Sequence, residues 1–323
     1  MVGKSIESHG QQKFILFPGS LGDFLCLLPA VHFLQGNPIR QNLTIVAREE
    51  AREVASWVPG VRKTISLDQS IFASLFSQEQ SPSSELFCLF SSAEEIFSWF
   101  GHSSHSVRSV LEKVAPQRVR SFAFFSGQED CHACLYYSRC IGGAELQAPS
   151  LHLQDEERSW VNSYWQKNGF LTSERLMVVH PGSGGKRKRW DTKGFIEVAR
   201  WWKEIRKGKL IILIGPAEEE GIDWQALGTL ARSLPLRHVA ALLSRADFYV
   251  GNDSGISHLA GAVGTRGIVI FGPTRPQQWR PLGGALIVLQ NARYREIYPE
   301  TPSISLAEIP VEAVLSALMH IGA

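Results

Sequence analysis

Long apolar runs are missing from this sequence of 323 residues. No uninterrupted apolar stretch approaches the ~20 residues that a membrane-spanning helix needs. The first residues, MVGKSIESHGQQK, are polar and lack the apolar core of a signal peptide, so we predict a cytoplasmic protein. Cysteine is also scarce, because five residues are too few for a disulfide scaffold and fit a reducing compartment better.

An excess of charge of one sign is lacking too. The 33 Lys and Arg residues nearly balance the 31 Asp and Glu residues, which leaves a net charge of +2. A protein that binds nucleic acid over its whole surface is usually far more basic, so we expect no nucleic-acid partner. Hydrophobic residues make up 44% of the chain and charged residues 20%, which excludes a disordered chain.

The sequence does contain short apolar segments that alternate with longer amphipathic ones. We expect strands at 13–18, 42–47, 63–67, 85–91, 118–125, 176–180, 209–214, 247–251 and 267–271, and helices at 23–34, 48–57, 154–168, 192–207, 236–245, 255–263 and 311–321. Continuous apolar strands that alternate with helices are typical of a parallel sheet covered on both faces. Two such series, separated by an irregular stretch from 126 to about 153, predict an α/β chain of two Rossmann-like domains.

The first glycine-rich motif runs from Gly19 through Ser20 and Gly22 to Asp23, after a predicted strand and before a predicted helix. Two glycines at such a junction let the backbone turn tightly and approach a ligand. Asp23 is either a general base that takes a proton from a hydroxyl, or an acidic residue that the helix dipole stabilises. The spacing is not GxGxxG, so it gives little support to a dinucleotide fold.

The second motif, His180-Pro-Gly-Ser-Gly-Gly-Lys-Arg-Lys-Arg-Trp190, also joins a strand to a helix. Its candidate ligand residues are Ser183, Gly184, Lys188 and Arg189. The glycines free backbone N–H groups to face an anion, and the basic residues add positive charge, a combination that suits a diphosphate. The alternative interpretations are a solvated basic loop and a nucleic-acid patch.

The third motif, Asn252 to His258, again lies between a strand and a helix. Asp253 or Ser254 can cap the helix, and the N–H groups of Ser254 and Gly255 are then available to an anion. A plain helix cap is the simpler alternative. The motif lacks the GxSxG elbow, which disfavours a hydrolase of the Ser–His–Asp type. Thr274, in the turn after the strand at 267–271, is a further candidate at the same edge of the sheet.

Two other groups of residues carry weaker signals. Cys131 and Cys134 have the spacing of a metal knuckle and Cys140 follows, but a fourth ligand is not obvious. Structural metal, a disulfide and unliganded thiols all remain open for these cysteines. The acidic run that includes Glu218 could meet a ribose hydroxyl, or it could be a favourable first helical turn.

Taken together, the motifs resemble those of glycosyltransferase family 9, the heptosyltransferases of lipopolysaccharide assembly. The resemblance rests on the order of the motifs: Gly19–Asp23 with Leu28-Pro29-Ala30, then His180–Trp190, then Asn252–His258 followed by Phe271-Gly-Pro-Thr274 and Trp279. The chain departs from the family pattern in its cysteines, which lie near the end of the first predicted domain instead of after Trp279.

The resemblance implies a GT-B fold, in which two Rossmann-like domains with parallel sheets face each other across a cleft. Residues 1–153 would bind the acceptor and residues 154–323 the donor, and the last helix, 311–321, could pack back toward the first domain. Asp23 then matches the family's catalytic base, and Lys188 matches the lysine that contacts donor phosphate. Asp253, Ser254 and Gly255 match the donor-binding turn.

The family also implies a reaction and its partners. A sugar, heptose or similar, would pass with inversion from a nucleotide-diphosphate donor to a hydroxyl of a lipopolysaccharide or another surface glycan. The implied reaction needs no metal or other cofactor. A membrane-anchored acceptor would bring the protein into peripheral contact with the inner membrane. The alternatives are another GT-B enzyme, such as a nucleotide-sugar epimerase, and a non-catalytic nucleotide-sugar binding protein.

Overall fold

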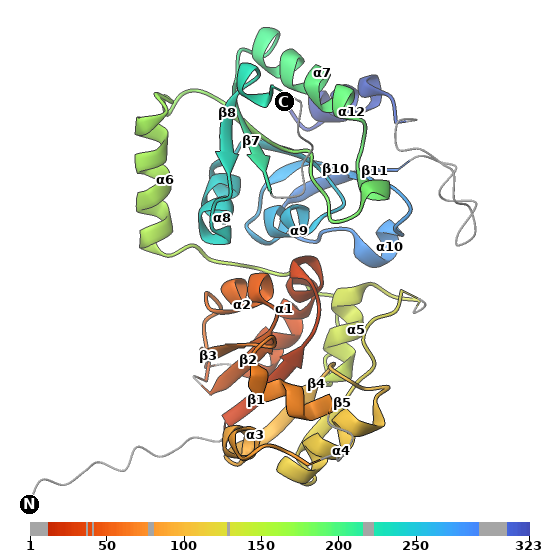
Figure 1. Ribbon diagram of the computed structural model, residues 1–323. Helices are drawn as coiled ribbons and strands as arrows, with labels where there is room; N and C mark the ends of the chain where they lie inside the picture. Colours follow the sequence, from red (N-terminus) through yellow and green to blue (C-terminus); the bar gives the residue numbers. More distant parts are fainter. Residues whose placement is uncertain are drawn as a thin grey trace, which may run out of the picture. The chain divides into compact units, whose positions relative to one another are not determined.

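The computed structural model describes residues 12–36, 38–40, 42–76, 81–127, 130–215, 223–290 and 309–323 (Figure 1). The chain forms two compact units. Unit 1 holds the described residues of 1–20, 30–129 and 136–144, and unit 2 holds those of 21–29, 130–135 and 145–323. Among the described helices, none is both long enough and apolar enough to cross a membrane.

Unit 1 contains a five-stranded sheet in the order β3-β2-β1-β4-β5, with every neighbouring pair parallel. The strands are β1 (Gln12–Phe17), β2 (Leu43–Ala47), β3 (Val61–Ser66), β4 (Ala93–Ser98) and β5 (Val119–Ser121). The helical segments are α1 (Leu21–Gln35), α2 (Glu49–Ala55), η1 (Ser70–Phe76), α3 (Ser84–Phe90), α4 (His105–Val114) and α5 (Ala133–Cys140). Helix α1 continues from unit 2, which holds its first nine residues.

The prediction for residues 85–91 is wrong, because this segment is helix α3 and not a strand. Ser83 caps the helix by accepting a hydrogen bond from the N–H of Leu86. Leu86 and Phe90, four residues apart, are buried on one side, while Phe87 is half exposed. That spacing is helical, whereas a short apolar run alone does not distinguish a strand from a helix. The fourth strand is β4, which the predictions did not include.

Two other predictions in unit 1 need correction. Strand β5 covers only Val119–Ser121, the first part of the predicted 118–125. Helix α5 lies within the stretch that the sequence predicts to be irregular. The ring of Tyr137, on α5, is fully buried and packs edge-on against Phe17 and Trp99, so aromatic packing holds this short helix. Such long-range aromatic contacts leave no periodic pattern in the sequence.

Unit 2 contains a six-stranded parallel sheet in the order β11-β10-β9-β6-β7-β8. The strands are β6 (Leu176–His180), β7 (Lys209–Ile214), β8 (Thr229–Arg232), β9 (Phe248–Asn252), β10 (Arg266–Phe271) and β11 (Ala285–Gln290). The helical segments are α6 (Asp155–Lys167), η2 (Lys186–Lys188), α7 (Thr192–Glu204), η3 (Trp224–Ala226), α8 (Leu236–Arg245), α9 (Gly255–Ala262), α10 (Pro276–Trp279) and α12 (Val311–His320). The two parallel α/β sheets confirm the predicted fold class.

Helix α12 packs against α7 and β10 within unit 2, and α7 and α12 lie together in Figure 1. Val314 and Leu318 are fully buried in the same hydrophobic cluster as Phe195 and Trp202 of α7. These contacts hold α12 within unit 2, and the expectation that the last helix could pack back toward the first predicted domain stays a prediction.

Candidate functional site

The second motif, the third motif and the turn that carries Thr274 meet at one edge of the sheet in unit 2. Strands β6, β9 and β10 are neighbours in this sheet and run in the same direction. The loops that follow their last residues, His180, Asn252 and Phe271, therefore leave from the same carboxyl edge. Ligands of parallel α/β sheets bind at such an edge, so the sheet order gathers segments that are far apart in sequence into one candidate site.

Asn252 ties two of these loops together. Its side chain is fully buried, its Oδ1 accepts a hydrogen bond of 2.9 Å from the N–H of Trp190, and its Nδ2 donates one of 2.7 Å to the carbonyl of Pro181. The amide thus holds both ends of the basic loop 181–190. Asn252 belongs to the third motif but is not among the predicted ligand residues, and its role is structural.

Lys188 and Asp253, both predicted donor-binding residues, form an ion pair of 2.8 Å between Nζ and Oδ2. The Asp253 side chain is 5% exposed and that of Lys188 38%, so the ammonium group reaches solvent while the carboxylate is enclosed. Ser183 is buried and donates a hydrogen bond of 2.8 Å from its Oγ to the carbonyl of Asp253. The structure therefore joins the basic loop directly to the turn that follows β9.

The other residues of the basic loop differ in their surroundings. The guanidinium group of Arg189 donates from Nε and Nη2 to the carbonyl of Ser183, at 3.2 and 3.1 Å, which folds the loop back on itself. Gly184 is exposed, and a Cβ added there would meet no atom within 4 Å. Gly184 therefore lies in open space, where its backbone is accessible to a ligand.

Helix α9 begins at the same place. Ser254 is its N-cap, and its Oγ accepts a hydrogen bond of 3.4 Å from the N–H of Ser257. The Ser254 hydroxyl also lies 3.4 Å from Nδ1 of His180. The first N–H groups of a helix have no partner within the helix and carry partial positive charge. Together with the ammonium group of Lys188, they make this corner suitable for an anion.

The first motif packs against α9. A Cβ on Gly22 would lie 3.2 Å from Cδ2 of His258, and a Cβ on Gly255 would lie 2.9 Å from Cβ of Leu21. A side chain at Gly255 would therefore collide with Leu21, while one at Gly22 would require the His258 ring to shift by a few tenths of an ångström. Asp23 follows as the third residue of α1 and is partly exposed, while the preceding Gly19 is buried and Ser20 exposed.

The negative charges of Asp23 and Asp253 both raise the pKa of one buried thiol, that of Cys26. The pKa of the Cys26 thiol is raised, first by its hydrogen bond to Cys134 and by burial, and further by the negative charges of these two carboxylates. Asp23 and Asp253 therefore lie close enough to the same thiol for their charges to be felt there. The arrangement brings a carboxylate on α1 near the start of α9.

Two buried histidines, His180 and His258, stay neutral at pH 7. Burial lowers the pKa of each from its usual 6.5 to about 4, and the positive charge of Arg189 adds to the effect on His180. Each imidazole is therefore a neutral hydrogen-bonding and packing group in this site. A neutral His258 suits its position between Gly22 and Cys26.

Because both histidines have lowered pKa values, we expect the folded protein to lose stability in weak acid. Between pH 6.5 and 4 the unfolded chain binds protons that the folded chain refuses, so the free energy of unfolding falls as the pH falls. The expected loss is on the order of 1 kcal/mol per pH unit for each histidine. Urea denaturation at pH 7 and at pH 5 measures it, with His258→Gln reducing the slope and the exposed His320→Gln as control. An equal slope in all three proteins would contradict this prediction.

Two candidate residues remain, Thr274 and Glu218. The carbonyl of Thr274, after β10, accepts a hydrogen bond of 3.0 Å from Nε2 of Gln290, so this backbone group braces the loop against β11. Thr274 therefore lies at the predicted edge of the sheet, where its backbone shapes the loop after β10. Glu218 lies outside the described residues.

Of the three alternatives that the sequence left open for the cysteines, the structure favours unliganded thiols. All five lie in the described part of the chain, and each is a thiol, with no disulfide between them. In the same part of the chain, no three His, Cys, Asp or Glu side chains are placed to hold a metal ion together. The Sγ of Cys26, a residue that the predictions did not single out, lies 3.7 Å from Nδ1 of His258. The absence of a metal stays a prediction.

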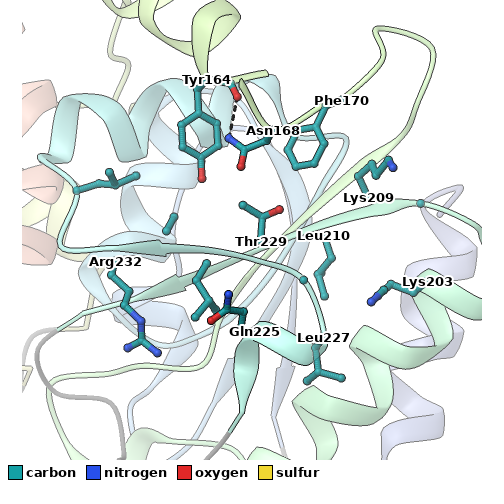
Figure 2. A pocket seen from close by; sticks show the side chains of 15 residues that line it. Tyr164, Asn168, Phe170, Lys203, Lys209, Leu210, Gln225, Leu227, Thr229 and Arg232 are labelled. Atoms are coloured by element: carbon teal, nitrogen blue, oxygen red, sulfur yellow. Dashed lines mark hydrogen bonds between the residues drawn. The ribbon is translucent and has the colours of Figure 1, made fainter. Parts of the chain in front are cut away.

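A separate cavity of about 910 Å³ lies along β8, the edge strand of the sheet (Figure 2). Figure 2 shows the rings of Tyr164 and Phe170 near the end of α6, with Lys203, Lys209 and Arg232 around the opening. Its described lining includes none of the residues predicted for the donor or acceptor. The cavity is therefore distinct from the site that the motifs build.

Comparison with known proteins decides the family. The model of glycosyltransferase family 9 (heptosyltransferase) matches residues 135–303, just over half of the chain. The chain belongs to glycosyltransferase family 9. The match includes the basic loop 181–190 and the turn after β9, so the residues that form the Lys188–Asp253 pair lie inside it.

Relatives of this family 9 chain include lipooligosaccharide heptosyltransferase 2 of Haemophilus influenzae. The two are 28% identical over 155 residues, which is 44% of each protein, so the chain matches about half the length of this relative. A solved family 9 glycosyltransferase from Veillonella parvula superposes with a TM-score of 0.76 at 18% identity, over 96% of this chain and 97% of that one. The E. coli ADP-heptose lps heptosyltransferase II gives 0.71 at 16% identity, over 96% and 98%. These likenesses confirm the GT-B fold.

Proposed function

We propose that this chain is a glycosyltransferase that moves a sugar from a nucleotide-diphosphate donor to a hydroxyl of a cell-surface glycan. The observation that carries the proposal is the Lys188–Asp253 pair at the start of α9, beside the N-terminal turn of α1 that bears Asp23. Diphosphate binding needs a cation and free N–H groups, and hydroxyl activation needs a carboxylate. In this proposal Lys188 is the cation, the backbone of Ser254 and Gly255 provides the N–H groups, and Asp23 is the carboxylate.

The donor we propose is an ADP-linked heptose or a similar sugar. The E. coli heptosyltransferase II of similar fold carries ADP-heptose in its name, and the name of the Haemophilus relative indicates a lipooligosaccharide acceptor. Unit 2, which contains the Lys188–Asp253 pair, would bind the donor, and unit 1 would bind the acceptor. An acceptor of this class is a glycolipid, so we also propose a cytoplasmic protein in peripheral contact with the membrane.

In the proposed mechanism, Asp23 accepts the proton of the acceptor hydroxyl while its oxygen attacks the anomeric carbon of the donor. Attack from the side opposite the leaving group inverts the configuration at that carbon. Negative charge grows on the leaving diphosphate, where the ammonium group of Lys188 and the N–H groups of Ser254 and Gly255 stabilise it. Asp253 holds that ammonium group at 2.8 Å and so positions it before the donor arrives.

Positive side chains and helix N–H groups can supply the charge that a divalent ion supplies in other enzymes. We therefore propose that transfer proceeds without a metal. Transfer measured with EDTA present is expected to match transfer without it. A rate that collapses in EDTA and returns with a divalent ion would contradict metal independence while leaving the transferase proposal intact.

A thermal-shift screen with ADP-, UDP-, GDP- and CDP-sugars in EDTA tests the donor site. A ligand that binds only the folded protein raises its stability, by about 2.7 kcal/mol at a concentration 100 times its Kd. We expect stabilisation by ADP-sugars. If millimolar concentrations of all four classes leave the melting temperature unchanged, the donor proposal is wrong. Product analysis with the donor that binds then separates transfer from epimerisation of the donor.

Lys188→Met is expected to weaken ADP binding by about 10- to 100-fold, because a charge-assisted hydrogen bond to phosphate contributes ~1.5–3 kcal/mol. Titration calorimetry with ADP measures the change. Lys186→Met is the matched control, since Lys186 is an exposed lysine of the same basic loop. Equal losses in both variants would mean that general loop charge, and not the paired lysine, binds the diphosphate.

A further inference from the structure

A buried tyrosine, Tyr249, reaches from β9 to the start of α9, although the proposed reaction does not use it. The residue is fully buried. Tyr249 and Gly251 are two positions apart on the strand, so they face the same side of the sheet. A Cβ on Gly251 would lie 2.1 Å from Oη of Tyr249. The missing side chain of Gly251 therefore leaves the room that the Tyr249 hydroxyl occupies.

The Tyr249 hydroxyl is hydrogen-bonded to a second buried hydroxyl. Its Oη lies 2.8 Å from Oγ of Ser257, a fully buried residue of α9. Ser257 in turn donates from Oγ to the carbonyl of Asn252, at 2.5 Å. A serine hydroxyl has one proton and a carbonyl only accepts, so Tyr249 is the donor in its bond to Ser257. The bonds therefore run in one direction, from Tyr249 through Ser257 to the Asn252 carbonyl.

That carbonyl belongs to the turn that is proposed to hold the donor. Two further backbone groups of the turn are fixed as well. The N–H of Asp253 donates to the carbonyl of Ile270 at 3.0 Å, and the Asp253 carbonyl accepts from Oγ of Ser183 at 2.8 Å. The next two N–H groups, those of Ser254 and Gly255, have no acceptor in the part of the chain that the structure describes. The turn therefore presents two free donors on a backbone that is otherwise held.

Ser257 also holds the residue on the other side of Asp253. Its backbone N–H donates to the carbonyl of Ser254 at 3.1 Å and to the Oγ of Ser254 at 3.4 Å. Ser257 is thus bonded to both neighbours of Asp253, the residue whose carboxylate pairs with Lys188. A change in the position of Ser257 therefore alters the turn that carries both the free N–H groups and the paired carboxylate.

We propose that Tyr249 is a positioning residue for the donor diphosphate. Its buried hydroxyl acts through Ser257, which fixes the Asn252 carbonyl and so sets the direction of the N–H groups of Ser254 and Gly255. Donors that are aligned before the ligand arrives need no reorganisation when it binds. Without the Tyr249 hydroxyl, Ser257 is free to turn its proton from Asn252 toward Oγ of Ser254, which lies 3.4 Å away. The inference rests on the proposed function, because it concerns how the same turn holds the donor.

Titration calorimetry of ADP binding to Tyr249→Phe tests the proposal, because this variant keeps the ring and loses only the hydroxyl. We expect the affinity for ADP to fall by about 2- to 10-fold, the range that corresponds to one ordinary hydrogen bond. The titration is made under conditions in which urea denaturation shows the variant to be folded. A purely structural role would lower the free energy of unfolding and leave the dissociation constant of ADP unchanged, and that result would overturn the proposal.

The variant Ser257→Ala and the double variant Tyr249→Phe/Ser257→Ala show whether the two hydroxyls act in series. Ser257→Ala should weaken ADP binding at least as much as Tyr249→Phe, since it releases the Asn252 carbonyl directly. The double variant should bind ADP as weakly as Ser257→Ala alone, because the Tyr249 hydroxyl is proposed to act only through Ser257. Losses that add up in the double variant would show two independent effects and would overturn the proposal.

The matched control is Tyr136→Phe, which removes a tyrosine hydroxyl from α5 of unit 1. This hydroxyl donates a hydrogen bond of 2.9 Å to the carbonyl of Ala123. Its loss should leave the affinity for ADP unchanged. An equal loss of affinity in Tyr136→Phe and Tyr249→Phe would mean that the effect is not specific to the turn after β9, which contradicts the proposal.

Hydrogen exchange tests the turn without any ligand. The amide protons of residues 252–258 should exchange faster in Tyr249→Phe than in the unaltered protein, while Tyr136→Phe should leave them unchanged. Equal exchange in Tyr249→Phe and the unaltered protein would overturn the proposal. An unaltered protein that does not bind ADP would contradict the proposed donor, while the exchange measurement still decides whether Tyr249 holds the turn.

Discussion

Replacement of Asp23 by asparagine is expected to lower the turnover of sugar transfer by about 10²- to 10⁴-fold, the usual contribution of a general base. Asparagine has nearly the same shape but cannot accept the proton of the attacking hydroxyl. Asp23 is partly exposed at the first turn of α1, so the acceptor can reach its carboxylate. Steady-state kinetics with a saturating donor measure the loss, and calorimetry should show a donor affinity within a few-fold of the original.

The matched control is Glu50→Gln, which removes an exposed carboxylate from the first turn of α2 in the same way. Glu50→Gln should leave turnover unchanged. Each substitution removes a similar favourable interaction between a carboxylate and a helix dipole, so this shared loss does not explain a difference in turnover between the two variants. Comparable turnover in Asp23→Asn and Glu50→Gln would overturn the assignment of the base. A loss of donor affinity as large as the loss of turnover would instead indicate that Asp23 acts in binding.

Asn252→Ala is expected to lower the free energy of unfolding by about 2–6 kcal/mol, because two buried backbone groups each lose a partner at a cost of ~1–3 kcal/mol. These groups are the N–H of Trp190 and the carbonyl of Pro181, at the two ends of the basic loop. The loop that carries Lys188 should loosen as well, so ADP affinity is expected to fall together with stability. Urea denaturation and calorimetry measure the two effects.

Asn168→Ala serves as the comparison for Asn252→Ala. The Asn168 amide is partly buried and donates one hydrogen bond of 2.8 Å to the carbonyl of Tyr164 at the end of α6. Its loss should cost about 1 kcal/mol, as for one ordinary hydrogen bond, and should leave ADP affinity unchanged. If Asn252→Ala is no more destabilising than Asn168→Ala, then Asn252 does not hold the basic loop.

Most strands and helices of unit 2 were predictable, because they are long and strongly patterned. Strands β6 and β7 and helix α8 have the predicted bounds. The prediction missed strands β8 and β11 of unit 2, and it assigned the wrong type of element in unit 1. The run 85–91 has the composition of a strand, but Leu86 and Phe90 are buried four residues apart and the segment is helix α3. Strand β4, with two glutamates among its six residues, has no continuous apolar run.

The sequence by itself determined the fold class, the order of the motifs and the residue types of the candidate site. Strand periodicity and glycine–polar junctions are local properties, so they can be identified without knowing which elements are neighbours. The family resemblance added roles for Asp23 and Lys188, which remain proposals. Sequence alone could not choose among metal, disulfide and thiol for Cys131, Cys134 and Cys140.

Only the tertiary structure decided which of these residues meet. The ion pair of Lys188 with Asp253 and the contact of Cys26 with His258 join positions 65 and 232 residues apart. Such contacts depend on the strand order β10-β9-β6 and on the close approach of α1 to α9 at Gly22 and Gly255. Neither feature has a local signature, because both follow from how complete elements pack.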